Sequence, residues 1–267
     1  MGHIRLTGIH LYPVKSFAGI ERQRSQLDSY GLQYDRHWMV VDEQGRFLSQ
    51  RELSRMALIR VNLAEDGISL TAPGMPDIEV GLPQQTSSSQ RQVRVWNDDC
   101  MAISADPSTN EWLSQFLQHG CRLVTMADGM NRQVDQRYAG PEDRTAFSDG
   151  FPLLLTSRES LDDLNGRLPQ LMTMDRFRPN LVVSGCNPFA EDEWSLIRIG
   201  YIVLRVVKPC SRCTITCVDP LTGERGVEPL KTLAGYRRKG NRVYFGQNLL
   251  HQQPGELEVG MSVEILE

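Results

Sequence analysis

The sequence predicts a β-rich α+β protein, and three observations lead to that prediction. Short apolar segments rich in β-branched residues, separated by turn residues, recur through roughly the first hundred residues. Helical spacing of apolar residues starts only near Asp106. Strands and helices do not alternate in a repeated strand–helix–strand order, so a doubly wound sheet is not expected. We therefore expect an N-terminal barrel-like or sandwich lobe, followed by a second β-rich lobe with a few short helices.

The N-terminal lobe is predicted from one strand and three hairpins. Alternating apolar residues from His3 to Leu11 form the first strand. Asp42-Glu43-Gln44-Gly45 marks a tight turn in the first hairpin, and Asp66-Gly67 marks the turn of the second. The polar stretch Gln84–Gln92 is expected to be a surface loop. The predicted hairpins pair residues 38–41 with 46–49, 58–63 with 68–70, and 93–96 with 100–103.

Helices and further strands are predicted in the second half of the chain. Asp106-Pro107 provides a helix start, and apolar residues follow it at helical spacing. Ser157 is the expected N-cap of a second helix, and a short third helix is expected at residues 228–233. The polar stretch 127–144 is expected to be a loop between the lobes. Further strands are expected at residues 152–156, 181–184, 196–207, 243–245 and 263–266.

Composition and charge are those of an ordinary globular protein. The net charge of −4 gives no electrostatic case for binding nucleic acid or a membrane surface. The N-terminus lacks the apolar segment of a secretion signal, and no apolar run approaches the roughly 20 residues that span a bilayer. Cys100, Cys121 and Cys186 are scattered and are expected to be buried reduced thiols. We expect a cytoplasmic monomer that binds no nucleic acid and no membrane.

Half of the six cysteines fall within eight residues: Cys210, Cys213 and Cys217. The apolar run 201–207 and the alternating run 214–218 predict two strands, with the cysteines on and after the short connection between them. Thiolates held close together beside Lys208 and Arg212 suit a metal or a redox function. A zinc site usually has two such pairs or added histidines, and a thioredoxin-type pair needs a helix after its first cysteine. Both are therefore less favoured, and purely structural cysteines remain an alternative.

Basic and amide side chains in further segments suit an anion. An extended chain would place Arg176, Arg178 and Asn180 on one face, where guanidinium groups and an amide fit a phosphate. Ion pairing with nearby carboxylates is the alternative. Lys15-Ser16 follows a strand and also suits an anion, although the glycines of a P-loop are missing. Two other positions have a plain alternative interpretation. Asp35-Arg36 could be a surface salt bridge, and Asp149 could form an Asx turn.

Together these segments match a known family pattern. The motifs occur in the order Val14-Lys15-Ser16, Asp35-Arg36, Phe147–Gly150, Phe177–Gly185, Lys208–Cys213 and Phe245–Asn248. The chain resembles MOSC-domain proteins that carry an N-terminal MOSC β-barrel domain, in particular the bacterial YcbX type and the mitochondrial amidoxime-reducing component. The resemblance implies an N-terminal β-barrel domain over residues 1–105 and a MOSC β-barrel domain over residues 106–267.

The resemblance also implies a molybdenum cofactor, a pterin dithiolene that carries the metal and a phosphate, held between the two lobes. Cys213 would be the thiolate ligand of molybdenum and the catalytic residue. Arg176 matches the family motif less closely, and Phe151 stands where the eukaryotic relatives have a small hydroxyl residue. The resemblance assigns cofactor contacts to Lys15, Ser16, Arg36, Asp149, Gly150, Arg178, Asn180, Ser211, Arg212 and Asn248.

The implied activity is the two-electron reduction of small N-hydroxylated compounds, with electrons from a separate iron–sulfur or flavin protein. YcbX-type proteins carry a C-terminal plant-type ferredoxin domain. This chain lacks the C-x₄-C-x₂-C spacing, so we expect no iron–sulfur cluster in it. Two other functions stay open: a sulfur carrier or sulfurtransferase that uses a persulfide on Cys213, and a non-enzymatic carrier of the molybdenum cofactor.

Overall fold

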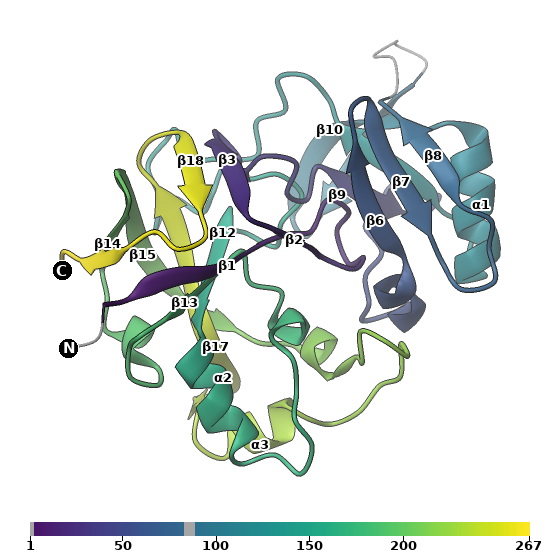
Figure 1. Cartoon of the computed structure of the whole chain (residues 1–267). Helices are drawn as coiled ribbons and strands as arrows, with labels where there is room; N and C mark the ends of the chain where they lie inside the picture. The colour runs from purple at the N-terminus through teal and green to yellow at the C-terminus, as the bar shows by residue number, and fades with distance from the viewer. Residues whose placement is uncertain (1–2, 83–88) are drawn as a thin grey trace.

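Two lobes lie side by side in the computed structural model of the chain, which describes residues 3–82 and 89–267 (Figure 1). The α1 lobe comprises residues 38–126, and the large-sheet lobe comprises the remaining strands with helices α2 and α3. Strands far outnumber helices in the described residues, which confirms the predicted β-rich α+β class. Most of the predicted surface loop at 84–92 lies outside the described residues, and its last part is wrong, because residues 90–92 belong to a strand. None of the helices within the described ranges is long and apolar enough to cross a membrane.

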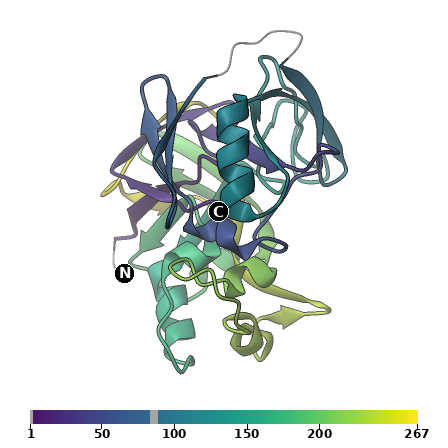
Figure 2. The ribbon, with the colours of Figure 1, turned by 90° about the vertical axis from the view of Figure 1, so that its right-hand side faces the viewer.

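The α1 lobe contains two antiparallel sheets that pack against one helix. The four-stranded sheet has the order β5 (Trp38–Val41), β11 (Arg122–Met126), β10 (Asp98–Ser104) and β9 (Gln90–Val95). The three-stranded sheet contains β6 (Arg60–Ala64), β7 (Gly67–Thr71) and β8 (Ile78–Gly81). Helix α1 (Pro107–Leu117) lies between the two sheets in Figure 2, and its apolar side chains share a core with both. The second and third predicted hairpins and the first predicted helix are confirmed.

The predicted return strand at 46–49 is wrong. Among the described residues the chain makes two isolated bridges there, Val41 with Phe47 and Arg46 with Arg94, and no continuous ladder. The reason is local: the carboxylate of Asp42 accepts the backbone N–H groups of Gln44 at 3.0 Å and Arg46 at 2.9 Å. An aspartate that binds its own following backbone holds a turn in place of a strand ladder. The chain then passes into the 3₁₀ turn η1 (Ser54–Leu58).

The large-sheet lobe is organised around one sheet of nine strands. Its order is β19 (Val263–Ile265), β14 (Leu196–Ile199), β15 (Ile202–Ser211), β17 (Arg242–His251), β12 (Leu153–Ser157), β13 (Leu181–Ser184), β1 (Arg5–Leu11) and β2 (Ile20–Arg22), with β16 (Arg238–Lys239) paired to β17. Only β12 and β13 pair in parallel, joined through α2 (Arg158–Asn165). A smaller sheet contains β18 (Gly255–Glu258), β3 (Arg24–Asp28) and β4 (Gly31–Leu32). The N-terminal strands β1 to β4 thus pair within this lobe; the domain division at residue 105 stays a prediction.

Two predicted strands of this lobe have different limits, and one is wrong. The predicted strand 196–207 is divided by a turn at Gly200, and the predicted strand 243–245 is part of the longer β17. Residues 214–218 do not form a strand but begin with the 3₁₀ turn η4 (Thr214–Cys217). The carbonyl of Cys213 accepts both the N–H of Thr216 at 3.1 Å and its hydroxyl at 2.9 Å, and this closes the turn. Burial does not follow the alternation either, because Thr216, Cys217 and Val218 are all buried.

Short helices cover one end of the large sheet. Side chains of α2, of α3 (Leu230–Ala234) and of the 3₁₀ turn η2 (Met174–Phe177) pack with Phe245 of β17. The 3₁₀ turn η3 (Ala190–Asp192) lies beside α2. All six cysteines, which lie within the described ranges, are free. Cys100 and Cys121 are buried as predicted, but Cys186 is only half-buried beside Glu159.

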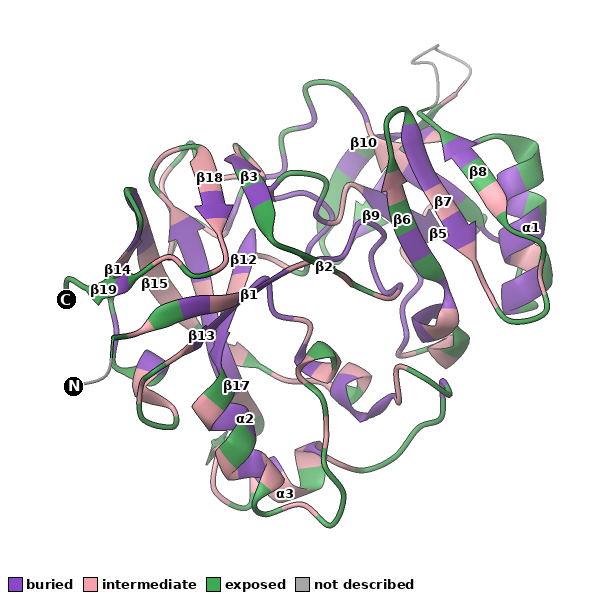
Figure 3. Cartoon of the chain, in the orientation of Figure 1, coloured by how far each residue is buried: buried purple, intermediate pink, exposed green. Residues whose placement is uncertain are grey.

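The chain crosses from one lobe to the other directly after β1. Leu6, Ile9 and Leu11 belong to the core of the large sheet, whereas Val14 and Phe17 belong to the core that contains α1. Figure 3 shows buried residues on strands of both lobes, for example on β1 and on β7. Residues 12–17 are therefore fixed by both cores at once, and polar side chains placed there lie at the junction of the lobes.

Candidate functional site: a cationic cavity around Cys213

All of the predicted site residues line one cavity of about 140 Å³ at the junction of the lobes. The crossing segment supplies Lys15 and Ser16, while β15 and the residues after it supply the cysteine motif. No predicted site residue lies elsewhere. The described lining is Lys15, Ser16, Arg36, Arg51, Ser148, Asp149, Gly150, Phe151, Leu154, Arg176, Phe177, Arg178, Asn180, Cys210, Ser211, Arg212, Cys213, Ile215, Thr216 and Asn248.

Cys213 lies where the long strand β15 ends. Beyond the strand, the N–H of Arg212 still donates to the carbonyl of Val243 in β17 at 2.8 Å, so this segment stays attached to the sheet. Cys213 itself has an extended backbone and precedes the turn η4. The neighbouring thiol of Cys210 accepts a hydrogen bond from Nη1 of Arg212 at 2.8 Å. Both cysteines are half-buried and line the cavity, but Cys210 lies within β15 with its thiol on Arg212, while Cys213 lies just after the strand.

Two guanidinium groups are held against one aromatic ring beneath the cavity. The guanidinium carbons of Arg36 and Arg178 lie 4.3 and 4.2 Å from the ring centroid of Tyr12, which is 1% exposed. Arg178 donates to the carbonyl of Phe17 at 2.6 Å, and Arg36 pairs with Asp35. Burial and, after it, the charge of Arg36 together lower the pKa of Arg178 to about 10. Two like charges this close favour a bound anion.

The backbone at three lining residues is in the left-handed region. Ser16, Arg36 and Arg178 have φ values of 71°, 54° and 53°. Side chains other than glycine rarely adopt this conformation, and it costs of order 1 kcal/mol or more at each residue. The predicted extended face that would carry Arg176 and Arg178 is therefore wrong: η2 precedes Arg178, whose N–H closes that turn on Asp175 at 3.0 Å. Both arginines reach the cavity from a turn.

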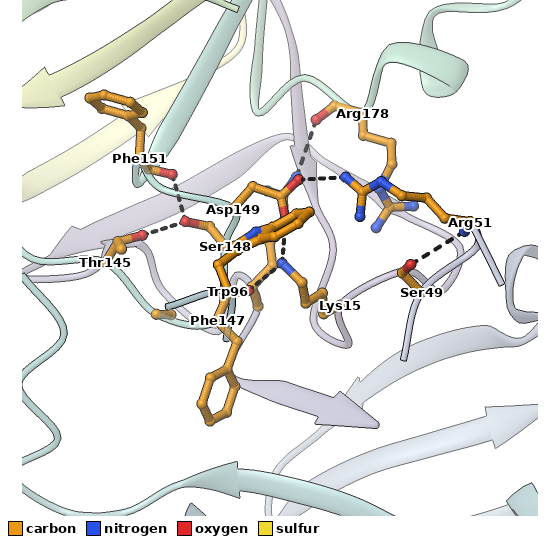
Figure 4. A network of polar contacts seen from close by, with 12 residues as sticks. Lys15, Ser49, Arg51, Trp96, Thr145, Phe147, Ser148, Asp149, Phe151 and Arg178 are labelled. Carbon is orange, nitrogen blue, oxygen red and sulfur yellow. Dashed lines mark hydrogen bonds and ion pairs between the residues drawn. The ribbon is translucent and has the colours of Figure 1, made fainter. Parts of the chain in front are cut away.

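Lys15 and Asp149 form the polar pair at the mouth of the cavity (Figure 4). The ammonium of Lys15 donates to Asp149 at 2.5 Å and to the carbonyl of Phe147 at 2.8 Å, and Arg51 and Trp96 also contact Asp149, each at 3.3 Å. Burial lowers the pKa of Lys15, which is 6% exposed, to about 8, although Asp149 acts in the opposite direction. Burial would raise the pKa of Asp149, but Lys15 and Arg51 hold it well below its usual range. The aspartate is thus a carboxylate at neutral pH.

Arg51 and Trp96 were missed by the sequence analysis. Arg51 follows Ser49, whose hydroxyl accepts the Arg51 N–H at 3.3 Å, and its guanidinium lies 4.8 Å from the Trp96 ring centroid. Burial lowers the pKa of Arg51, but the charges of Asp149 and then of Cys213 raise it by more. Both residues lie in turns without a recognisable motif, so no signal in the sequence could have identified them.

Arg132 was also missed, and it organises the loop that carries Asp149. Its side chain is almost fully buried and donates to Asp98 at 2.8 Å, to the carbonyl of Ala146 at 2.9 Å and to that of Ser148 at 2.5 Å. These bonds tie the turn of the α1 lobe to the loop at the mouth of the cavity. Arg132 lies within the stretch 127–144 that was predicted to be a loop between the lobes. Its polar neighbours give no hint that it is buried.

The cavity wall contains more hydrogen-bond donors than the chain itself satisfies. Among the described lining residues, Asp149 is the one carboxylate against a lysine and five arginines. Within the described ranges, Nη1 of Arg51 and Nε of Arg212 are buried without a partner. Buried cationic donors call for an anionic acceptor, and a phosphate or another planar anion fits them. The described residues contain no group of three or more His, Cys, Asp or Glu arranged around a metal. The soft ligands in the wall are the thiols of Cys213 and of Cys210, which accepts from Arg212.

Comparison with known proteins supplies independent findings. The chain matches the model of the MOSC N-terminal beta barrel domain at residues 3–120 and that of the MOSC domain at residues 142–264. It is 33% identical to the mouse mitochondrial amidoxime-reducing component 1 over 96% of this chain and 80% of that protein, and 34% identical to the human one over 96% and 81%. It is also 32% identical to the molybdenum cofactor sulfurase of Oryza sativa subsp. japonica, over 91% of this chain but 32% of that protein.

Proposed function

The chain belongs to the MOSC family with its N-terminal β-barrel domain, and from this we propose that it binds a molybdenum cofactor and reduces N-hydroxylated compounds. The substrate class is taken from the name of the amidoxime-reducing relatives. In the reaction, R–NH–OH takes up two electrons and two protons and gives R–NH₂ and water. The electrons would come from a separate iron–sulfur or flavin protein.

The described residues fit this cofactor in two ways. Cys213 offers a thiolate to a soft, redox-active metal. Arg36 and Arg178, held on Tyr12, offer two guanidinium groups to the phosphate of the cofactor. When bound, the group supplies a metal that accepts and passes on two electrons. Further contacts would come from Lys15, Ser16, Asp149, Gly150, Asn180, Ser211, Arg212 and Asn248.

The observation that carries the proposal is the unsatisfied donor set around Cys213. Arg51 and Arg212 each leave one buried nitrogen without a partner in the described part of the chain. Each unmet donor costs roughly 1–3 kcal/mol, and of the buried atoms without a partner in the described residues these two line the same cavity. A structural role for the cavity leaves this cost without compensation, whereas an anionic ligand beside the thiol meets it.

Sulfur transfer is the second candidate, and one observation favours it. The rice relative is named a molybdenum cofactor sulfurase, and the half-buried Cys213 is open enough to carry a persulfide. In this function the Cys213 thiolate would take a sulfane sulfur atom from a persulfide donor, whose own thiolate leaves, and no metal would be bound. The third candidate is a carrier that holds the molybdenum cofactor in the same cavity and passes it on without turnover.

One preparation tests all three functions. The protein is purified from a host able to synthesise the cofactor, and molybdenum and pterin are measured per chain. Turnover of an aromatic amidoxime is then followed with a chemical reductant, and the amidine product is quantified. We expect about one molybdenum per chain, as one cavity holds one cofactor, and formation of the amidine. Molybdenum without turnover indicates a carrier, and release of sulfur from a molybdenum-free protein indicates a sulfurtransferase.

A further inference from the structure

The hairpin formed by β16 and β17 carries a cluster of basic side chains outside the cavity. Arg238 and Lys239 lie in β16, Arg242 begins β17, and Gly240 makes the turn with a φ of 61°. The three basic side chains are exposed, and none of them forms a hydrogen bond or an ion pair in the described part of the chain. Figure 2 shows this yellow-green hairpin projecting from the body of the large-sheet lobe.

The neighbouring Arg237, in contrast, has a structural role, because its guanidinium has partners within the chain. It pairs with Asp192 at 2.5 Å, and its guanidinium lies 4.1 Å from the ring centroid of Phe189. The three side chains beyond it have no such partners. In a chain with a net charge of −4, adjacent unpaired cations produce a local positive potential that attracts an acidic partner.

The base of this hairpin is attached to the segment that carries Cys213. Tyr244 of β17 pairs with Ser211 of β15, and the carbonyl of Val243 accepts the N–H of Arg212 at 2.8 Å. Neighbouring strands lie about 5 Å apart, so a partner seated on the hairpin lies close to the cavity wall. Electron-transfer rates fall steeply with distance, and this closeness is what a site of electron entry requires.

Resting on the proposed function, we propose that Arg238, Lys239 and Arg242 form the docking surface for an acidic electron-carrier protein. A partner with an iron–sulfur centre would deliver one electron per encounter, its iron passing from the ferrous to the ferric state. Two encounters supply the two electrons that R–NH–OH needs, and the two protons come from water. Redox partners form small and transient interfaces, commonly below about 1,200 Å², so a short hairpin with few charges is sufficient.

Charge reversal at the hairpin tests this assignment against a matched control. The control reverses three exposed arginines on β2, β9 and β11, strands that do not pair with β15 or β17. Both variants change the net charge equally and leave the cavity lining intact. The hairpin variant is Arg238→Glu, Lys239→Glu and Arg242→Glu, and the control variant is Arg22→Glu, Arg91→Glu and Arg122→Glu.

Binding is measured first, with oxidised plant-type [2Fe–2S] ferredoxin as the acidic probe and the cofactor-loaded protein. We expect the hairpin variant to bind about ten- to a hundredfold more weakly than the wild type at low ionic strength, and the control to bind normally. The difference should vanish near 1 M salt, where the Debye length falls to about 3 Å. Equal loss in both variants, or none in the hairpin variant, overturns the proposal.

Turnover separates docking from chemistry. With reduced ferredoxin, the hairpin variant should reduce an amidoxime about ten- to a hundredfold more slowly than the control. With reduced methyl viologen, a small dye that needs no docking surface, the two variants should be equal to the wild type. Absence of turnover with the dye in the wild type contradicts the proposed function, and the binding measurement still decides the role of the hairpin. If duplex DNA or anionic vesicles bind more tightly than ferredoxin and lose binding in the hairpin variant, the assignment to a protein partner is wrong.

Discussion

Two buried polar clusters of this protein differ in whether their charged groups have hydrogen-bond partners within the chain. At the start of α2, the fully buried carboxylate of Glu191 accepts hydrogen bonds from the hydroxyls of Ser157 at 2.9 Å and Ser160 at 2.8 Å, and from the Ser157 N–H at 3.3 Å. In the cavity, Arg51 and Arg212 leave buried donors without a partner among the described residues. The first cluster is complete within the chain, while the second is not.

This difference separates residues that build the fold from residues that await a ligand. Burying a charge is costly unless hydrogen bonds or an opposite charge compensate it. The chain compensates Glu191 itself, so that cluster stabilises the junction of α2 with its neighbours. In the cavity several cations have carboxylate partners, but one nitrogen each of Arg51 and Arg212 is left without an acceptor among the described residues. Substitutions in the first cluster should therefore change stability, and substitutions in the second should change ligand retention and activity.

The largest effect is expected at Cys213. If only this cysteine ligates molybdenum, Cys213→Ala should lower turnover below detection and alter the metal's electronic spectrum, while the free energy of unfolding changes little. Cys210→Ala is the matched control: its thiol also lines the cavity but is hydrogen-bonded to Arg212, and we expect turnover and spectrum to be kept. Turnover, bound metal and spectrum are measured for both variants. Equal loss of these properties in the two would show that both sulfurs are needed and would contradict the assignment.

The opposite behaviour is expected at Glu191. Glu191→Ala leaves two buried hydroxyls and one N–H without their acceptor, which should lower the free energy of unfolding by about 2–4 kcal/mol. For a chain of this size Tm should fall by roughly 5–10 °C. Glu191→Gln keeps a carbonyl acceptor and should cost less. Molybdenum per folded chain should stay unchanged in both, and a selective loss of molybdenum would break the comparison.

A smaller effect is expected at Arg36 and Arg178. If they bind the phosphate of the cofactor, replacing either with Ala removes a charge-assisted contact of about 1.5–3 kcal/mol and weakens retention about ten- to a hundredfold. The free energy of unfolding of the cofactor-free protein should fall less, because burial disfavours the charged guanidinium of Arg178 in the folded state. Pterin is measured after dialysis, with the exposed Arg198→Ala as control. Normal pterin content in both cavity variants would favour ordinary ion pairing.

The pH dependence of stability sharpens the comparison at Lys15. Its pKa is about 8 in the folded protein and 10.5 in the unfolded chain, because burial disfavours the charged ammonium. Between these values the unfolded chain binds more protons, so the free energy of unfolding rises with pH, by at most about 1.4 kcal/mol per unit. Below about pH 8 both states are protonated and this rise is absent. The free energy of unfolding is measured against pH for the cofactor-free wild type and for Lys15→Met. The difference between the two proteins should change between about pH 8 and 10.5, and a difference independent of pH would contradict the lowered pKa of Lys15.

The sequence by itself determined the local elements and the identity of the predicted site residues. Trp38–Val41, the turn at Asp66-Gly67 and the cap at Ser157 follow from alternation and turn chemistry, which act over a few residues. The motifs around Lys15 and Cys213 were enough to predict residues that the fold gathers into one cavity. Their roles toward a cofactor stay predictions.

Only the tertiary structure decided where the charged side chains lie and which of them have a hydrogen-bond or ion-pair partner. Arg51 contacts Asp149 across 98 positions and Arg132 contacts Asp98 across 34, distances along the chain over which no local pattern acts. The alternating residues after Cys213 fold as a 3₁₀ turn because one carbonyl accepts both donors of Thr216. Local preferences select strands and turns, but whether a buried donor has a partner depends on segments that meet only when the chain is folded.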